Sequence, residues 1–149
     1  MDWTDILKHI DAGEDAHTEF KRGPGDLKPL GRAICAFANG EGGVAILGVD
    51  DEGNVVGVRD KPQALQERLT SFLQSGCSHP VSARIAFHEN EDAQERVLWI
   101  EVPRQRSYEP LRSEGRVWVR RERSNVEPSP AELQELYNIF GYVLTEEQA

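Results

Sequence analysis

The sequence is short of cysteine, of long apolar runs and of positive charge. Its two cysteines, Cys35 and Cys77, are too few for a disulfide framework, so we expect a cytoplasmic location. No apolar run approaches the ~18 residues that a membrane-spanning helix needs, and the first residues lack the basic-then-apolar order of a signal peptide. We therefore expect no membrane partner.

Basic residues are outnumbered. The chain has 17 Lys and Arg against 26 Asp and Glu, a net charge of −9 at pH 7. This balance argues against indiscriminate nucleic-acid binding, because affinity for phosphate depends mostly on cationic contacts. The distribution of charge is more informative than the sum. Seven of the 17 basic residues lie between residues 104 and 123, where the sequence has only three Glu. These basic residues are Arg104, Arg106, Arg112, Arg116, Arg120, Arg121 and Arg123.

The chain contains enough apolar residues for one folded domain. Its 149 residues are 38% hydrophobic, as expected of a globular protein. No repeat, low-complexity tract or long linker divides them. We expect a single domain over residues 1–149, with an N-terminal helix at 1–12, a core at 14–127, and a C-terminal helix and tail at 130–149.

A helix, a glycine turn and two strands are predicted in the middle of the chain. Small apolar residues at Ala33–Ala38 indicate the end of a buried helix, which the glycine-rich Asn39–Gly43 interrupts. The continuous apolar run Val44–Val49 indicates a strand covered on both faces. Asp50–Asn54 is an acidic turn, and we expect Val55–Val58 to return as a second strand of a hairpin.

Further elements are predicted on both sides of this stretch from apolar periodicity and from Pro or Gly at the boundaries. Helices are expected in the first twelve residues, after Asp26, from Lys61 to Gly76 and after Pro130; strands are expected at Thr18–Lys21, Val81–His88, Arg96–Val102 and around Val117–Val119. The order predicts an α/β fold of the α+β type. We expect a single compact domain in which helices pack on a mixed, mostly antiparallel sheet of about five to six strands.

Residues 36–57, AFANGEGGVAILGVDDEGNVVG, resemble the signature of the AlbA_2 or Schlafen-type domain. Upstream, His17–Lys21 resembles the Glu-Phe-Lys strand of that family. Downstream, Gly115–Ser124 resembles its G-x-x-Y-V-R-x-G-S strand, although Trp118 stands for the tyrosine and Glu122-Arg123 interrupts the usual glycine. The resemblance covers roughly Glu14 to Tyr137. It implies the family's fold and a nucleic-acid-binding function.

Three carboxylates are candidates for one site: Glu14, Glu19 and Asp51. They converge at one end of the sheet if the strand at residues 18–21 pairs near Val44–Val49. Clustered carboxylates repel one another and persist mainly where a divalent cation binds them, and such a cation can activate water against a phosphodiester. The ribonuclease-active Schlafen proteins carry a Glu-x4-Glu pair followed by an Asp, and this chain is similar at these three positions.

The resemblance implies Glu14, Glu19, Asp51 and Lys21 as catalytic residues, with Mg²⁺ or Mn²⁺ held by the three carboxylates. Lys21 and Arg22 could hold a phosphate or neutralise its developing charge. A structural alternative stays open for each residue. Asp51 belongs to an ordinary turn, and Glu19 can simply pair with Lys21 along the strand.

The basic strip offers a second candidate surface. In a strand, Arg116, Trp118 and Arg120 share one face, while Val117 and Val119 share the other. Since the valines already supply a buried face, we expect Trp118 to be exposed as a stacking platform between cations that track a phosphate backbone. The alternative places Trp118 in the core. The predicted nucleic-acid contacts are Lys21, Arg22, Arg116, Trp118, Arg120, Arg121 and Arg123.

The Schlafen nucleases that this chain resembles add a zinc site and a second lobe. We expect no zinc site from Cys77 and the scattered histidines, and we expect these 149 residues to form one lobe only. A homodimer would restore a two-lobed arrangement, with exposed sheet edges as the interface.

We therefore expect a nucleic-acid-binding domain for RNA or DNA. The first alternative is a divalent-metal-dependent endoribonuclease that uses the Glu/Glu/Asp cluster. The second is a protein-interaction module that presents its acidic surface to a protein.

Overall fold

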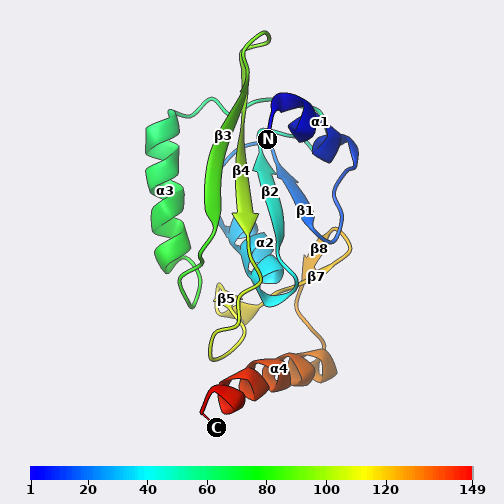
Figure 1. The fold of residues 1–149 in the computed structure, drawn as a ribbon, viewed down its shortest axis with the longest axis vertical. Helices are drawn as coiled ribbons and strands as arrows, with labels where there is room; N and C mark the ends of the chain where they lie inside the picture. The colour runs from blue at the N-terminus through cyan, green and yellow to red at the C-terminus, as the bar shows by residue number, and fades with distance from the viewer. Residues whose placement is uncertain (149) are drawn as a thin grey trace.

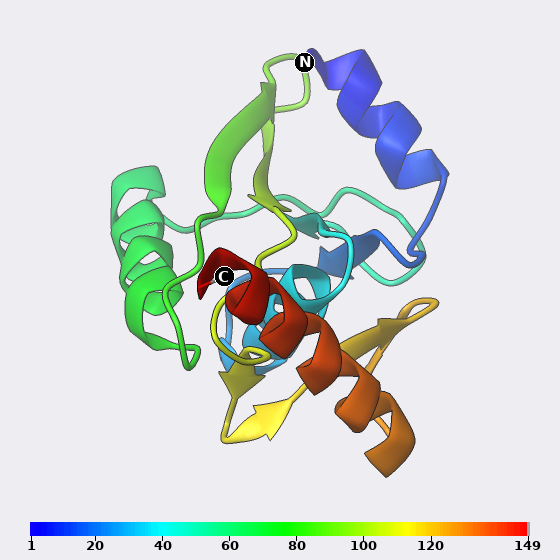
Figure 2. The same ribbon diagram turned by 60° about the horizontal axis from the view of Figure 1, so that its bottom comes forward.

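Two strands with mostly apolar side chains, residues 43–47 and 95–102, form the middle of the main sheet. The computed structural model describes residues 1–148, and the side chains of residues 1–141. Figures 1 and 2 show the fold. Its elements are α1 (Trp3–Asp11), β1 (Thr18–Lys21), α2 (Lys28–Asn39), β2 (Gly43–Leu47), α3 (Pro62–Ser75), β3 (Arg84–Asn90), β4 (Glu95–Val102), β5 (Arg112–Ser113), β6 (Arg116–Val117), β7 (Val119–Arg121), β8 (Ser124–Val126) and α4 (Pro130–Gln148).

The main sheet has the order β1-β2-β4-β3. β1 runs parallel to β2, and both pairings of β4 are antiparallel, so Ile46 stands between Phe20 and Trp99. The expected α+β domain with a mixed, mostly antiparallel sheet is confirmed. The predicted number of strands is wrong, because the described part of this sheet has four strands and the remaining four form two separate hairpins, β5–β6 and β7–β8.

Each face of the sheet covers its own apolar layer. Ala45 and Leu47 of β2 pack with α2 and α3 on one face, and Val44 and Ile46 pack with α1 on the other. Successive side chains of a strand point to opposite faces, so β2 must be apolar throughout. The prediction of a strand covered on both faces is confirmed.

The predicted hairpin partner at Val55–Val58 is wrong. Only an isolated bridge joins Val49 to Val55, and the amides of Val56 and Gly57 both donate to the carbonyl of Gly48. β2 already has β1 along one edge and β4 along the other. No edge is left for a third partner, so the chain crosses the end of β2 and leaves the sheet.

The turn from α2 into β2 depends on close backbone contact. Gly42 has a left-handed φ of 87°, which favours glycine. A Cβ on Gly43 would come within 2.4 Å of the Phe37 ring. The glycine-rich sequence therefore lets the strand turn back closely over the end of its own helix.

The C-terminal helix α4 lies across the end of the molecule that carries the two hairpins (Figure 2). Phe140 is its buried anchor and packs beneath the guanidinium of Arg106, 5.1 Å from the ring centre. The helix continues to Gln148, into the region that was assigned to a tail from the sequence. Among the described residues, none of the helices is long and apolar enough to cross a membrane.

Candidate functional site

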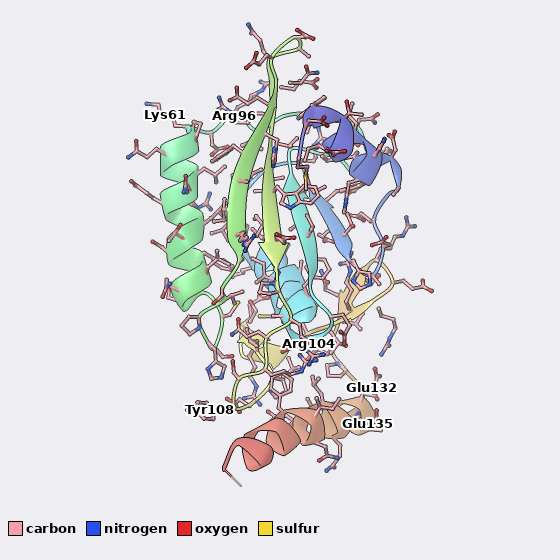
Figure 3. The ribbon with its side chains drawn as sticks, viewed as in Figure 1. Lys61, Arg96, Arg104, Tyr108, Glu132 and Glu135 are labelled. Carbon is pink, nitrogen blue, oxygen red and sulfur yellow. The ribbon has the colours of Figure 1, made fainter. Side chains whose placement is uncertain are left out.

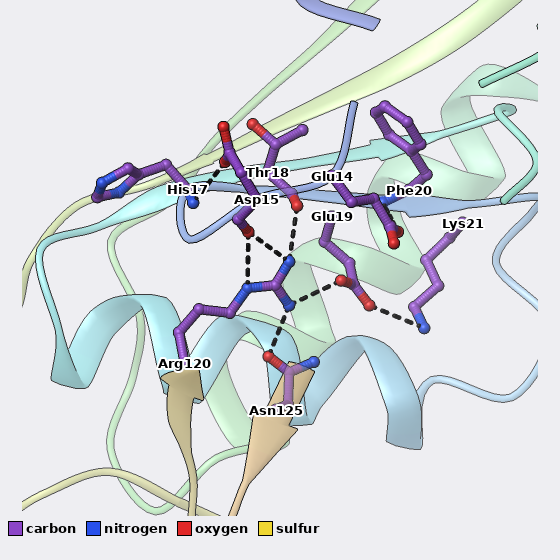
Figure 4. A network of polar contacts seen from close by, with 9 residues as sticks. All are labelled: Glu14, Asp15, His17, Thr18, Glu19, Phe20, Lys21, Arg120 and Asn125. Atoms are coloured by element: carbon purple, nitrogen blue, oxygen red, sulfur yellow. Dashed lines mark hydrogen bonds and ion pairs between the residues drawn. The ribbon is translucent and has the colours of Figure 1, made fainter. Parts of the chain in front are cut away.

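A buried ion pair joins the first strand to the second hairpin (Figure 4). Glu19 of β1 is 6% exposed, and its Oε2 lies 2.7 Å from Nη1 of Arg120 in β7. Its other oxygen, Oε1, lies 3.2 Å from Nζ of Lys21. One carboxylate thus binds two cations, one of which comes from a position 101 residues away.

Arg120 is fully engaged in holding the structure together. Its guanidinium makes five hydrogen bonds: one to Glu19, one to the side chain of Asn125, one to the carbonyl of Thr18 and two to the carbonyl of Asp15. Its side chain is 4% exposed. The guanidinium therefore closes the outer edge of β1. The prediction that Arg120 contacts phosphate is wrong, because the side chain is buried and its donors are taken.

Glu14 lies at the same edge of β1. Its Oε1 accepts a hydrogen bond of 2.7 Å from the amide of Phe20. Burial raises the pKa of Glu14, and the charges of Glu19 and Asp51 raise it further, while the Phe20 amide and Arg120 oppose the shift. The three predicted carboxylates are thus close enough for Glu14 to sense the other two.

Asp50, not Asp51, organises the acidic turn. Its Oδ1 accepts from the amides of Glu52 and Asn54 at 3.0 and 2.8 Å. These contacts, led by the Asn54 amide, lower the pKa of Asp50. Asp51 is exposed beside it. Asp50 is not among the site residues predicted from the sequence. Asp side chains at the start of a turn commonly accept a hydrogen bond from the backbone amide two residues further along, as Asp50 does from Glu52, and this pattern could have identified it.

The carboxylates as arranged do not fit a divalent cation. Both oxygens of Glu19 are bound by cations, and one oxygen of Glu14 accepts the Phe20 amide. Within the part of the chain that the structure describes, no three His, Cys, Asp or Glu side chains are grouped as metal ligands. A metal at this edge would have to compete with Arg120 and Lys21 for Glu19.

Lys21 and Arg22 follow Glu19 at the carboxyl end of β1. The Lys21 side chain is 28% exposed. Arg22 is exposed, and its charge contributes to lowering the pKa of Asp50. Lys21 thus pairs with Glu19, whereas Arg22 acts on the acidic turn.

The prediction of an exposed Trp118 is wrong. The residue is 8% exposed, and its indole Nε1 donates to the Ser113 carbonyl at 3.0 Å. Arg32 covers its ring at 4.9 Å. The strand that would have turned Trp118 outward is interrupted there, since β6 ends at Val117 and β7 begins at Val119. The alternation of side chains along one continuous strand does not hold across this break, so it placed Trp118 on the wrong face.

Asn39 holds the backbone in place at this break between β6 and β7, and it is not among the site residues predicted from the sequence. The residue is 2% exposed, and its side-chain amide donates to the carbonyls of Leu111 and Trp118, while its Oδ1 accepts from the Leu111 amide. A buried Asn at the end of a helix ties α2 to the segments on either side of the first hairpin. In the sequence, Asn39 is indistinguishable from an ordinary helix-ending residue.

The other arginines predicted to contact nucleic acid downstream, Arg116, Arg121 and Arg123, lie at the surface. Arg116 pairs with Glu127 at 3.4 Å, and Arg121 pairs with Glu132 of α4 at 2.5 Å. Figure 3 labels Glu132 on that helix. Arg123 is exposed in the β7–β8 turn, with no ion-pair partner among the described residues.

Comparison with known proteins assigns the fold and the family. The model of the family Schlafen, AlbA_2 matches residues 14–129. The N-terminal domain of a RecG-related protein from Nitrosomonas europaea is 25% identical with a TM-score of 0.62, over 87% of this chain and 91% of that chain. The DIP2311 protein from Corynebacterium diphtheriae is 17% identical with a TM-score of 0.63, over 91% of this chain and 31% of that chain, a likeness of fold.

Proposed function

The chain belongs to the Schlafen AlbA_2 family, and from this we infer that it is a domain that binds RNA or DNA through the outer edge of β1 and the adjoining β7–β8 turn. The name of the Nitrosomonas europaea relative connects that protein to a DNA helicase, which supports a nucleic-acid partner. Because the net charge of the chain is −9, the contact with phosphates has to be confined to a small basic part of the surface.

The shared carboxylate of Glu19 carries this proposal. Lys21 and Arg120 bind the same side chain, so the segments around them lie side by side (Figure 4). Arg22 follows Lys21 and Arg121 follows Arg120 in the sequence, and Arg123 lies in the β7–β8 turn; all three residues are exposed. Together with Lys21 they form the proposed phosphate-binding surface. Glu19 and Arg120 hold this surface in place from beneath.

Contacts of this surface are electrostatic. Trp118 is buried and offers no ring for base stacking. The ion pair of Arg121 with Glu132 is exposed, and such pairs contribute on the order of 0–1 kcal/mol, so a phosphate can replace the carboxylate. We therefore expect strong salt dependence and little preference for base sequence.

The test is fluorescence anisotropy with labelled single-stranded RNA, single-stranded DNA and duplex DNA at several salt concentrations. The variant Arg121→Gln/Arg123→Gln removes two proposed phosphate contacts. For single strands we expect the slope of log K against log salt to decrease by about 1.4, two contacts at roughly 0.7 each. Arg84→Gln is the control for loss of one cation elsewhere, because Arg84 is exposed on β3 at the opposite edge of the sheet, and we expect its slope to stay unchanged. Equal losses in both variants would contradict the proposal.

RNA cleavage is a second candidate function. The observation that favours it is the raised pKa of Glu14 beside two further carboxylates, because perturbed carboxyl groups are typical of acid–base sites. The assay uses labelled tRNA and single-stranded RNA with Mg²⁺, Mn²⁺ or chelator. Asp51→Asn and Glu14→Gln test the site, whereas Glu19→Ala would leave Arg120 buried without its carboxylate. Cleavage that both variants leave unchanged would exclude these carboxylates.

The predicted homodimer and the cytoplasmic location stay predictions. β1 is closed by Arg120 and Glu14, while β3 is the open edge of the sheet. A dimer formed through the sheet would therefore use β3. Light scattering across a dilution series measures the mass, and a monomer at every concentration would contradict the dimer. If the chain neither binds nor cleaves nucleic acid at low salt, a protein-interaction module becomes the better account.

A further inference from the structure

The two cysteines meet in the fold although 42 residues separate them in the sequence. Cys35 is fully buried on α2, and Cys77 is half-buried just after α3. Their sulfur atoms lie 3.2 Å apart, and the Cys35 thiol donates to the Cys77 sulfur. Both residues are free thiols.

We propose that Cys35 and Cys77 form an oxidisable dithiol whose disulfide cross-links α2 to the segment that follows α3. Closing the bond requires the sulfur atoms to approach by about 1.2 Å, from 3.2 Å to the roughly 2.05 Å of a disulfide. Cys77 lies outside regular structure, beyond the last residue of α3, so it can make this movement. Cys35 is held within a helix and stays in place.

The two thiols have different parts in the reaction. The hydrogen bond from Cys35 lowers the pKa of Cys77, and the same bond together with burial raises the pKa of Cys35. Cys77 is also the more accessible, so its thiolate attacks the oxidant. With a low-molecular-weight disulfide as oxidant, Cys77 displaces one thiol and forms a mixed disulfide. The Cys35 sulfur then attacks the Cys77 sulfur and releases the second thiol, with its proton passing to solvent. The chain loses two hydrogens, and the oxidant is reduced to two thiols.

The cross-link would reinforce a chain of contacts that ends at α4. Ser78 follows Cys77 directly, and its amide donates to the Arg112 carbonyl at 2.9 Å, while its hydroxyl accepts from the Arg112 amide at 2.8 Å. The Arg112 guanidinium in turn contacts the Tyr137 hydroxyl on α4. Oxidation therefore links α2, the end of α3 and β5 on the side of the molecule that holds the C-terminal helix.

The test equilibrates the native protein with oxidised or reduced glutathione, then combines thiol counting, mass spectrometry and thermal unfolding. We expect oxidation to remove both thiols within one chain and to raise the unfolding midpoint by roughly 5–15 °C, since the bond closes a loop of 42 residues. Cys77→Ser is the control because the residue is only half-buried. Its midpoint should be the same in both redox buffers.

Three results would overturn the proposal. Two free thiols after equilibration with the oxidant would show that the bond does not form. A lasting glutathione adduct on Cys77 would show that Cys35 does not resolve it. Cross-linked pairs of chains would assign the reactivity to contacts between molecules. Each result is read by mass alone, independently of nucleic-acid binding.

Discussion

At the scale of single residues, the burial of Arg120 and Glu19 decides what the candidate site can do. A cation predicted at the surface lies inside, with five hydrogen bonds, and a carboxylate predicted as a metal ligand is its partner. Replacing one member of a buried ion pair is costly, because the other charge stays buried without a partner. In the proposed complex with nucleic acid, we therefore expect both residues to hold β1 against β7 and not to contact the ligand.

Replacing Arg120 measures this role. Arg120→Gln leaves Glu19 buried beside Lys21 alone, and we expect it to lower the free energy of unfolding by roughly 3–5 kcal/mol. Urea denaturation measures the loss. Arg123→Gln, three residues away and exposed, should change stability by about 0.5 kcal/mol or less. Similar small effects in both variants would show that the buried pair contributes nothing.

Glu14 gives a pH-dependent prediction. Its pKa is raised in the folded state, chiefly by burial, so the folded chain binds this proton more tightly than the unfolded chain. The associated stability is present below the unfolded pKa and is lost as pH rises through the folded pKa. Glu14→Gln removes this titration. As pH rises from about 4 to neutral, we therefore expect the free energy of unfolding of the variant to increase relative to that of the wild type. Urea denaturation at both pH values checks it, and parallel curves would contradict the raised pKa.

At the scale of elements, the sequence predicted the apolar strands well and the short hairpins poorly. β2 is apolar from Val44 to Leu47, so its burial on both faces follows from composition, and β4 has a buried apolar centre; the positions of both strands were predicted within a residue or two. The stretch from Arg116 to Val126 is different. A hydrogen bond from the distant Asn39 fixes the carbonyl of Trp118 between two short strands, and no local pattern shows it. The same dependence on distant partners hid the pairing of Glu19 with Arg120.

The position of Trp118 is tested by truncation. Trp118→Ala removes a buried ring that packs under Arg32, and we expect a loss of about 3–5 kcal/mol in the free energy of unfolding. Tyr108→Ala is the comparison, because Tyr108 is 72% exposed in the loop before β5 (Figure 3). It should change stability by about 0.5 kcal/mol or less. A Trp118→Ala protein as stable as wild type would mean that the indole lies outside the core.

At the scale of the whole molecule, the two edges of the sheet have different roles. The β1 edge is closed by side chains from Glu14 and Arg120, and exposed cations follow β1 (Arg22) and occur in the β7–β8 hairpin that Arg120 joins to it (Arg121 and Arg123). The β3 edge is open and lies on the far side of the sheet. An acidic chain can therefore present a local basic surface to a nucleic acid while its net charge keeps other surfaces away from phosphate.

Mapping a bound oligonucleotide by NMR tests the central claim most directly. A short single-stranded RNA is titrated into isotope-labelled protein at low salt, and the amide shifts are followed. We expect the shifts to gather at Lys21, Arg22 and residues 121–123, with residues 84–90 of β3 unchanged. Shifts confined to β3, or no shifts with RNA or DNA, would contradict the proposed surface.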